Sequence, residues 1–478
     1  MSKALIVLAL PANKGGIIIK KTILLLILAL FVFFSGCQKE TTFPTTGPPS
    51  TEEAFVYDPI DVPEYVLEEE RLSFKFFWEA VNGNPESRGY GMITDRYNVD
   101  TGALGAASIA SIGFGLASLI AGIENDWIDY QEGYERALGT MNTLSSINRT
   151  HGFFYHFLNM NNGGRDGYSE VSIIDTALLI AGCLTAGEYF GGEVKEVATF
   201  LAESVEWDWY YHWDRMCFYM GYQPESGFSG YWEGYAEQLI MYVLAAGSID
   251  YSVGKEAYTH MKTLSQKRQY GSSELFYTTH AGTLFTYQFS HAFIDFRHIV
   301  DQEGIDWFEN SVQASIAAYD YAVAASVSYA TLSDVAWGLT ASDGPDGYKG
   351  NYGNLPSLGG NYIDGTLAPC GAIGSIVFTP ELVIPAIENY ASIPNLQSKY
   401  GFRDAYNLGL TETALPTVNR PSTPIPANGW FNEWVIGIDK GITLLMIENY
   451  RSNLIWHYFM QSEIVQRGLE VLEFTEIP

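Results

Sequence analysis

Basic residues are scarce in this sequence of 478 residues. Lysine and arginine number 26 against 55 aspartates and glutamates, which gives a formal net charge of −29 at pH 7. Binding to a phosphate backbone depends on a basic surface that releases counterions, so the composition argues against nucleic acid as a partner. It also argues against an acidic polysaccharide as the preferred ligand.

Cysteine and histidine are rare as well. The chain has four cysteines and eight histidines, with no CxxC pair and no HExxH motif. We therefore expect no metal and no other cofactor. We expect Cys183, Cys217 and Cys370 to be buried thiols rather than a disulfide framework. The GxSxG nucleophile elbow and the GxxxxGK[ST] phosphate loop are also missing.

The N-terminus has the layout of a bacterial lipoprotein signal. Two lysines precede an apolar run at residues 22–34, and Ser-Gly-Cys37 follows it. The run is short for a membrane span, which needs roughly 20 residues. We expect residues 1–36 to be removed and Cys37 to carry the lipid, with residues 37–57 as a flexible tether. The predicted location is the cell envelope, periplasmic or on the outer-membrane surface; an uncleaved membrane anchor is the alternative.

Residues 58–478 are predicted to form one domain of alternating helices. Nearly apolar segments recur along the chain, and amphipathic segments with charged faces lie between them. A helix that is apolar on most sides is buried, whereas an amphipathic helix covers it and faces water. Six such pairs in a closed ring would form an all-α (α/α)6 toroid; an open α-solenoid is the alternative. The predicted inner helices begin near residues 108, 171, 231, 291, 371 and 439.

Long loops rich in glycine, asparagine, aspartate and aromatic residues separate the predicted helices. Loops of this length in a compact domain are usually functional. Aromatic residues make up 15% of the chain, and their flat apolar faces suit sugar rings. We therefore place Trp232 and Trp430 at a sugar-binding cleft. Asp343 is a further candidate there, although its Ser-Asp-Gly-Pro-Asp-Gly setting favours a turn.

Carboxylates beside aromatic residues are typical of glycoside hydrolases, in which one acid protonates the leaving oxygen and a second carboxylate acts as base or nucleophile. Glu237 is the strongest candidate for the acid. Ile240, Met241 and Leu244 follow it at helical spacing, which would bury its carboxyl and raise its pKa. Glu233, one turn earlier, would share this face as a substrate-binding residue. The alternative for both is a place at the positive N-terminus of the helix.

A second group of carboxylates lies where the loop 163–170 enters another predicted inner helix. Asp166 and Glu170 would face the cleft from the mouth of this helix, and we take both as catalytic candidates. Asp175 is a substrate-binding candidate. The spacing from Ser172 to Asp175 also matches a capping box, which would explain Asp175 without a substrate.

Charged residues also occur within apolar helical patterns. Arg297 follows Asp295 by two positions, so the two would not face each other on one helix, whereas Glu448 and Arg451 are spaced to form a pair. A buried charge is costly unless it has a partner. An ion pair that braces the ring is the favoured explanation. Binding of sugar hydroxyls by Arg297, Glu448 and Arg451 is the alternative.

Five marks of a known family are spread over nearly the whole predicted domain. They are Ser169-Glu-Val-Ser-Ile-Ile-Asp-Thr-Ala-Leu-Leu, Trp337-Gly-Leu-Thr-Ala-Ser-Asp-Gly-Pro, Asp364-Gly-Thr-Leu-Ala-Pro, Phe378-Thr-Pro-Glu, and Ile438-Asp-Lys-Gly with Ile447-Glu-Asn-Tyr-Arg. Together they resemble the bacterial glycoamylase-like family, which contains endo-β-1,2-glucanases and is related to a domain of cyclic β-1,2-glucan synthases.

The resemblance implies an (α/α)6 barrel that cleaves β-1,2-glucan with inversion of configuration and releases sophorooligosaccharides. The acidic catalytic candidates of the family cluster before and within the Ser-Glu-Val-Ser segment and in a later inner helix. These places match Asp166, Glu170 and Glu237.

The sequence therefore predicts a lipid-anchored glycoside hydrolase, an endo-β-1,2-glucanase that acts as a monomer on an oligo- or polysaccharide. A non-catalytic glycan-binding lipoprotein is one alternative, although it would need no carboxylate on an apolar helix face. A polysaccharide lyase on the same toroid would need a basic cleft, which fits poorly with the acidic chain. A hydrolase of the same fold that acts on another glucan is a further alternative.

Overall fold

The computed structural model describes residues 55–410 and 428–477, which belong to one compact unit. The predicted signal (1–36), the lipidation site Cys37 and most of the tether (37–57) lie outside the described residues. The predictions made for them therefore stay predictions.

Nearly apolar segments form the inner layer of this unit, as predicted. α5 is apolar and long enough to cross a membrane, but 83% of it is buried inside the unit, so it is a core helix. The inner segments are α3 (Ile109–Glu124), α5 (Ile173–Phe190), α7 (Leu239–Gly247), α10 (Pro369–Ile373), α12 (Gly437–Ser452) and the 3₁₀ turns η2 (Leu284–Tyr287) and η3 (Phe289–Ala292).

The inner segments close into a ring. α3 packs between α5 and α12, α5 packs on α7, and α10 joins η2 to α12. The remaining junction is a hydrogen bond of 3.1 Å from the backbone N–H of Ile240 at α7 to the hydroxyl of Ser290 in η3. Because the ring closes, the arrangement is a helical toroid and not an open solenoid.

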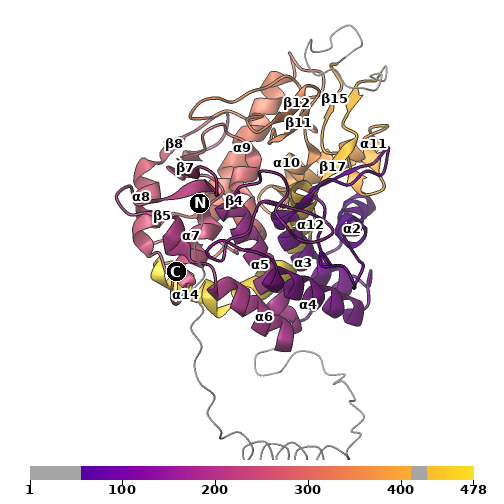
Figure 1. Cartoon of the computed structure of the whole chain (residues 1–478). Helices are drawn as coiled ribbons and strands as arrows, with labels where there is room; N and C mark the ends of the chain where they lie inside the picture. Colours follow the sequence, from indigo (N-terminus) through magenta and orange to yellow (C-terminus); the bar gives the residue numbers. More distant parts are fainter. Residues whose placement is uncertain (1–54, 411–427, 478) are drawn as a thin grey trace, which may run out of the picture. The chain divides into compact units, whose positions relative to one another are not determined.

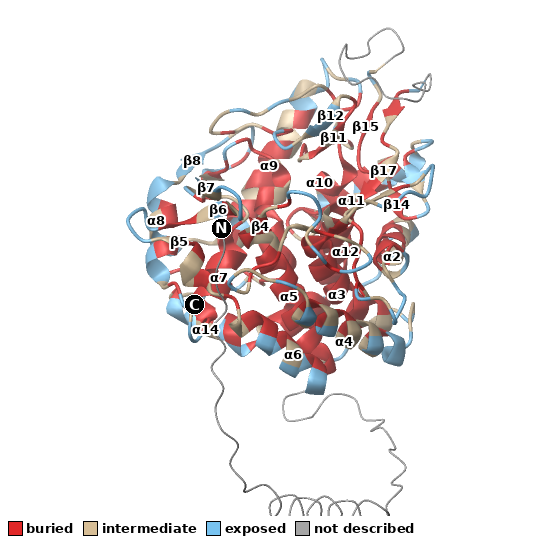
Figure 2. Ribbon diagram, viewed as in Figure 1, coloured by how far each residue is buried: buried red, intermediate tan, exposed pale blue. Residues whose placement is uncertain are grey.

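Amphipathic helices cover the ring, and Figure 2 shows their exposed outer faces around the buried inner helices. α4 packs on α3, α6 on α5, α8 on α7, α9 on η2 and α11 on α10, while α2 lies against α12 and α3. Their bounds are α2 (Glu64–Glu79), α4 (Tyr130–Ser146), α6 (Gly192–Glu203), α8 (Lys255–Leu264), α9 (Trp307–Ala325) and α11 (Pro380–Ser392); α13 (Leu454–Met460) and α14 (Glu463–Val471) follow α12.

Short antiparallel strands are the feature that the helical pattern did not predict. A strand of two or three residues carries too little alternation to be detected in a sequence. The pairs are β1 (Arg96–Asn98) with β17 (Trp434–Ile436), β2 (Ala107–Ser108) with β3 (Phe157–Leu158), β8 (Gln266–Arg268) with β9 (Phe276–Thr278), β10 (Ile299–Val300) with β18 (Thr475–Glu476), β11 (Ser342–Gly344) with β12 (Gly347–Lys349), β13 (Gln397–Ser398) with β14 (Gly401–Phe402), and β15 (Tyr406–Asn407) with β16 (Trp430–Phe431). One larger sheet joins β4 (Val171–Ser172), β6 (Cys217–Gln223), β5 (Tyr211–His212) and β7 (Gly227–Tyr231), and the 3₁₀ turn η1 (Trp207–Tyr210) precedes β5.

The strands mark one end of the toroid. β2 leads directly into α3, β4 into α5 and β17 into α12, so these inner helices begin where the strands end. Most of the labelled strands in Figure 1 lie above α3, α5 and α7 in the view. Polar side chains at the N-termini of the inner helices are therefore brought to the strand end of the ring.

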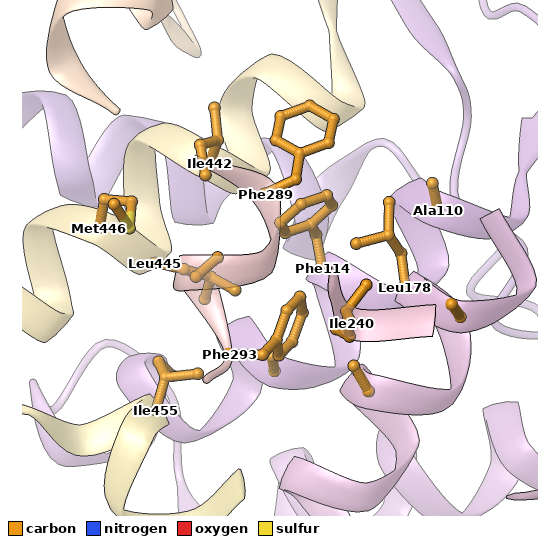
Figure 3. Close-up of a cluster of buried hydrophobic side chains, with 14 of the residues drawn as sticks. Ala110, Phe114, Leu178, Ile240, Phe289, Phe293, Ile442, Leu445, Met446 and Ile455 are labelled. Carbon is orange, nitrogen blue, oxygen red and sulfur yellow. The ribbon is translucent and has the colours of Figure 1, made fainter. Parts of the chain in front are cut away.

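The core fills the centre of the ring. Phe114 of α3 lies against Phe289 and Phe293, with ring centroids 5.8 and 5.7 Å apart, and Figure 3 shows these rings together with Leu178 of α5. Gly113 and Gly182 allow the close approach of α3 and α5, because a Cβ atom on either would clash with the backbone of the other helix. Cys183, Cys217 and Cys370 are buried free thiols, as predicted.

Three predicted inner helices have different bounds in the structure. The helix predicted from residue 231 begins only at Leu239, because Gly234 adopts a positive φ of 82° that a helix does not accept. The segment predicted from residue 371 divides into α10 and α11, and the break lies before Pro380, where helical backbone is disfavoured. The segment from residue 291 contains no α-helix: it holds the end of η3 and the strand β10.

Candidate active site

A cavity of about 250 Å³ opens at the strand end of the ring. A second cavity of about 390 Å³ shares Arg96 and Tyr348 with it. The wall of the first combines apolar rings with charged groups: Asp95, Arg96, His156, Phe157, Phe285, Phe289, Ala341, Tyr348, Ile436, Ile438 and Asp439.

Glu237 lies in the turn before α7 and not on the helix, which corrects the sequence prediction. Its backbone carbonyl accepts a hydrogen bond of 2.6 Å from the hydroxyl of Ser290, which fixes the turn against η3. Its Oε2 atom is buried and has no hydrogen-bond partner among the described residues. Burial, together with the charge of Asp175, raises the pKa of Glu237 to about 8. The raised pKa agrees with the prediction, and the carboxyl is mostly protonated at pH 7.

Tyr348 connects Glu237 to the cavity. Burial of the Tyr348 hydroxyl raises its pKa, and the charges of Asp439 and Glu237 raise it further. The charges of both carboxyls therefore reach the same phenol in the cavity wall, although Glu237 itself is not one of the lining residues. No local feature of the sequence indicates this, since Tyr348 is in the β11–β12 hairpin, far along the chain from both.

His156 joins two of the predicted carboxylates at the cavity wall. Its Nδ1 atom is 2.8 Å from Oε1 of Glu170, and its Nε2 atom is 3.6 Å from Oδ1 of Asp175. Burial opposes a charge on His156, but the two carboxylates outweigh it and raise the pKa of the imidazole to about 9. The hydrogen bond from His156 lowers the pKa of Glu170. This wall therefore holds an imidazolium with a carboxylate on either side.

Asp175 lies at the N-terminal cap of α5, as its spacing from Ser172 indicates, and its role in substrate binding stays a prediction. The hydroxyl of Ser172 accepts from the backbone N–H of Asp175 and also lies 2.5 Å from its Oδ2, which caps α5. The other carboxyl oxygen faces His156. Asp175, at the capped end of an inner helix, thus also places a charge next to His156 in the cavity wall.

Asp439 is the principal residue that the sequence reasoning left out of the site. It lines the cavity from the first turn of α12 and is buried. Burial raises the pKa of Asp439, while contacts with the carboxyl of Asp404 and the thiol of Cys370 and the charge of Lys440 act in the opposite direction. The Ile438-Asp-Lys-Gly segment had been quoted only as a family mark, and no spacing rule connects it to Glu237.

The second cavity contains two of the predicted binding residues. Trp430 and Asp343 line it, and Oδ2 of Asp343 is 2.9 Å from Nη1 of Arg96. Asp343 also lies in the β11–β12 hairpin, so the turn that its sequence favoured is present as well. Arg96 is held from its other side by Asp95, 3.0 Å from its Nε atom, and so separates the two cavities.

Asp166 and Glu233 are not part of the cavity wall. Asp166 is exposed in a turn, where its backbone carbonyl accepts from the N–H of Ser169 at 3.0 Å. Glu233 forms an ion pair of 2.7 Å with Arg215 beside a separate open hollow. The predicted shared face with Glu237 does not exist, because the break at Gly234 removes the helix that would have aligned them.

Two further candidates are also placed elsewhere. Arg297 forms a bidentate pair of 2.8 and 2.7 Å with Asp295. This pairing corrects the expectation that the two would not meet, which assumed a helix at this segment. Arg297 lies over the ring of Trp456 at 4.2 Å. Trp232 is buried in the core cluster and lines neither cavity.

The pair Glu448 and Arg451 lies at the opposite end of α12 from Asp439. Nη1 of Arg451 is 3.6 Å from Glu448, 2.7 Å from Glu70 of α2 and 3.1 Å from Asn125. All four groups connect neighbouring helices and line neither cavity. The position supports the bracing role over sugar binding.

No group of three or more potential metal ligands is found among residues 55–410 and 428–477. The charged groups of the cavity can instead donate and accept protons. A carboxyl that is protonated at neutral pH and a buried aspartate near the same phenol are the components of acid–base catalysis.

Residues 229–463 match the model of the Glycoamylase family, which is described as "Putative glucoamylase". The match covers a little under half of the chain. The matched part contains Glu237, Tyr348 and Asp439, whereas His156 and its two carboxylates precede it. The family resemblance inferred from the sequence is thereby confirmed.

Similarity to individual proteins covers more of the chain than the family match does. The exo β-1,2-glucooligosaccharide sophorohydrolase (non-reducing end) of Parabacteroides distasonis is 26% identical over 442 residues, which covers 84% of this chain and 57% of that relative. This chain therefore spans little more than half the length of the curated relative. The endo-β-1,2-glucanase of Chitinophaga pinensis, solved with sophorotriose and glucose, is 26% identical with a TM-score of 0.75, over 87% of this chain and 99% of that one.

A β-1,2-glucanase structure from P. distasonis has the same fold, with a TM-score of 0.71 and 24% identity over 87% of this chain and 60% of that one. The names of these relatives are those of glycoside hydrolases, and they support a glycosidase.

Proposed function

We propose that this protein is a glycoside hydrolase that cleaves β-1,2-glucan at internal bonds, with inversion, on an (α/α)6 scaffold. The relatives named above act on β-1,2-linked glucans according to their names, one as an exo- and one as an endo-enzyme. The two adjoining cavities support internal cleavage, because a chain could extend from one into the other past Arg96 and Tyr348.

Glu237 is the proposed general acid. A glycosidic oxygen leaves as an alcohol only if it receives a proton, and the donor must therefore hold one at working pH. Glu237 meets this condition because its pKa is raised to about 8. The observation that carries the proposal is this protonated carboxyl, whose charge when ionised acts on the same cavity-wall tyrosine as that of Asp439.

Asp439 is the proposed general base. In an inverting enzyme the base takes a proton from the water that attacks the anomeric carbon on the face opposite the leaving group. Asp439 lines the cavity from a rigid helix, so its position is well defined. Glu170 is the alternative base: the hydrogen bond from His156 lowers its pKa and keeps it ionised, but His156 stands between it and the cavity wall.

Incubation of the domain from residue 51 onward with single glucans tests the activity. Linear β-1,2-glucan, starch, β-1,3-glucan and xyloglucan are supplied separately and the products are resolved by chromatography. Sophorooligosaccharides of several lengths from β-1,2-glucan alone are expected. Sophorose alone would indicate exo action, and products from starch would overturn the substrate. The anomeric NMR signal of the first product reports inversion or retention.

A glycan-binding protein without catalysis is the second candidate, supported by the aromatic rings in both cavities. It predicts that β-1,2-glucan binds and is returned uncut. We also propose that the protein acts as a monomer, anchored to the cell envelope through a lipid on Cys37. Metabolic labelling with a radioactive fatty acid tests the anchor: the wild-type chain should incorporate the label and Cys37→Ser should not.

A further inference from the structure

Asp404 is a buried carboxylate directly behind Asp439, outside the wall of the first cavity. It is only 4% exposed. Its Oδ2 atom accepts two hydrogen bonds, of 2.9 Å from the backbone N–H of Asp343 and of 3.0 Å from the side-chain amide of Asn432. These bonds hold the carboxyl in one orientation and connect it to the wall of the second cavity.

The other oxygen of Asp404 faces a second carboxyl. Oδ1 is buried and receives no hydrogen from the N–H and O–H groups of the described residues. The carboxyl of Asp404 is in hydrogen-bond contact with that of Asp439, and the two line the same small cavity behind the first one. Two carboxylate oxygens in contact repel each other unless one of them holds a proton. The geometry of the pair therefore requires a proton between Asp404 and Asp439.

We propose that Asp404 is a positioning residue that holds this proton and donates it to Asp439, which keeps Asp439 ionised and aimed into the cavity. The inference rests on the proposed role of Asp439 as general base. A base needs a free lone pair toward the attacking water, and a hydrogen bond donated from behind leaves one oxygen of Asp439 available for it.

Several features place the proton on Asp404 rather than on Asp439. Asp439 has the thiol of Cys370 and the ammonium of Lys440 nearby, and it lies in the first turn of α12, where the helix dipole favours a negative charge. Asp404 is at no helix terminus. Burial raises the pKa of Asp404 well above its usual range, and the charge of Asp439 raises it further.

The other charged groups around the pair do not supply this proton. Lys440 forms an ion pair with Glu69, in which its Nζ atom is 2.8 Å from Oε1. Arg96 forms ion pairs with Asp95 and Asp343. The titratable and charged groups that face the pair are Asp343, Tyr348, Cys370, Lys440, Arg96, Glu69 and Arg403. Together with Asp404 and Asp439 they comprise four carboxyl groups and three cations, an excess that one bound proton neutralises.

Two substitutions at Asp404 separate a proton donor from a charged group. In Asp404→Asn the amide oxygen can accept from Asp343 and Asn432 while the NH₂ group donates to Asp439, which reproduces the protonated acid permanently. Asp404→Ala removes all three bonds. We expect Asp404→Ala to lose more than tenfold in kcat on β-1,2-glucan, and Asp404→Asn to restore kcat to within about threefold of wild type. Equal losses in both variants would overturn the proposal.

The dependence of stability on pH gives a readout that does not need activity. The folded wild type holds a proton that an unfolded aspartate has released above about pH 4. Raising the pH therefore lowers the folding equilibrium constant of the wild type, relative to that of Asp404→Asn, by up to tenfold per pH unit. Denaturant unfolding of both proteins between pH 5 and 8 measures this difference. Parallel curves would overturn the proposal.

Infrared spectroscopy tests the same proton without relying on a variant that must fold. Wild-type protein with ¹³C-labelled aspartate should show the carbonyl band of a protonated carboxylic acid at pH 7, and protonated glutamates do not contribute to the labelled signal. Asp301→Asn is the matched control, because Asp301 is equally buried but is ionised against Lys262 at 2.7 Å. The band should be lost in Asp404→Asn and kept in Asp301→Asn.

The results distinguish failure of this inference from failure of the proposed function. If the wild type cleaves no glucan, the activity is wrong, and the infrared band with the stability curves still decides where the proton is. If the wild type cleaves β-1,2-glucan and the band is absent, the assignment to Asp404 is wrong and the activity stands.

Discussion

The two ends of α12 carry similar chemistry with different surroundings. At its N-terminal end, Asp439 and Lys440 meet Asp404 and Glu69; at its C-terminal end, Glu448 and Arg451 meet Glu70. The first end buries two more carboxyls than it has cations, and the second end one more. The first end opens into a cavity of about 250 Å³, whereas the second is enclosed by α2, α3 and the N-terminal segment.

The difference shows that an excess of buried acid does not by itself indicate a catalytic site. At the closed end, burial raises the pKa of Glu70 well above its usual range, and Glu448 adds to this, so the extra charge is neutralised by a proton. At the open end, neutralisation of a buried carboxyl by a proton places a protonatable group beside a space that a substrate can enter. Access to the cavity, rather than the type of residue, separates the two roles.

The largest expected effect is at the open end. Glu237→Gln keeps the shape of the side chain but removes the proton that the leaving group needs. We expect kcat on β-1,2-glucan to fall by roughly 10²–10⁴-fold, the range for loss of a general acid. The melting temperature should stay close to that of the wild type, because the carboxyl is largely neutral at pH 7. A variant that kept a tenth of the wild-type rate would contradict this role.

Breaking the closed end should act on stability instead. Arg451→Met leaves Glu70 and Glu448 without their cation, and loss of one partner of a buried pair costs about 3–5 kcal/mol. Denaturant unfolding measures this loss, while kcat of the folded fraction should be unchanged. Arg71→Met is the matched control, because its pair with Glu68 is exposed and should cost less than about 1 kcal/mol.

The pH dependence of activity sharpens the contrast further. Glu237 must be protonated to act, so the rate should fall as the pH rises through about 8. Above that pH the decline approaches tenfold per pH unit. Initial rates measured from pH 5 to 10 give kcat/KM as a function of pH. An alkaline limb whose apparent pKa lies far from 8 would assign the acid to another group. Arg451→Met should show the same limb, since the closed end does not contact the cavity.

The smallest effect is expected at Glu233, which the sequence placed beside Glu237. Its pair with Arg215 is exposed and lies outside both cavities. Glu233→Gln should change stability by no more than about 0.5 kcal/mol and leave kcat unaltered. A loss of activity comparable to that of Glu237→Gln would show that the substrate reaches the hollow at Arg215.

The sequence supported the inner and outer helices and the choice of Glu237 and Glu170, because apolar periodicity and loop composition are local. It did not predict which side chains the fold brings together. Asp439 and Tyr348 are brought toward Glu237 only by closure of the ring, and His156 comes to Glu170 and Asp175 through the folding of the loop between α4 and α5. Gly234 was visible in the sequence, but only its positive φ shows why Glu233 and Glu237 diverge.

The most direct test of the central claim is a crystal structure of Glu237→Gln with a linear β-1,2-glucan oligosaccharide. The account predicts sugar rings in the cavity between residue 237 and Asp439, with a glycosidic oxygen in contact with the introduced amide and the chain continuing toward Trp430. Sugar bound elsewhere, such as at the hollow beside Arg215, with this cavity empty, would contradict it.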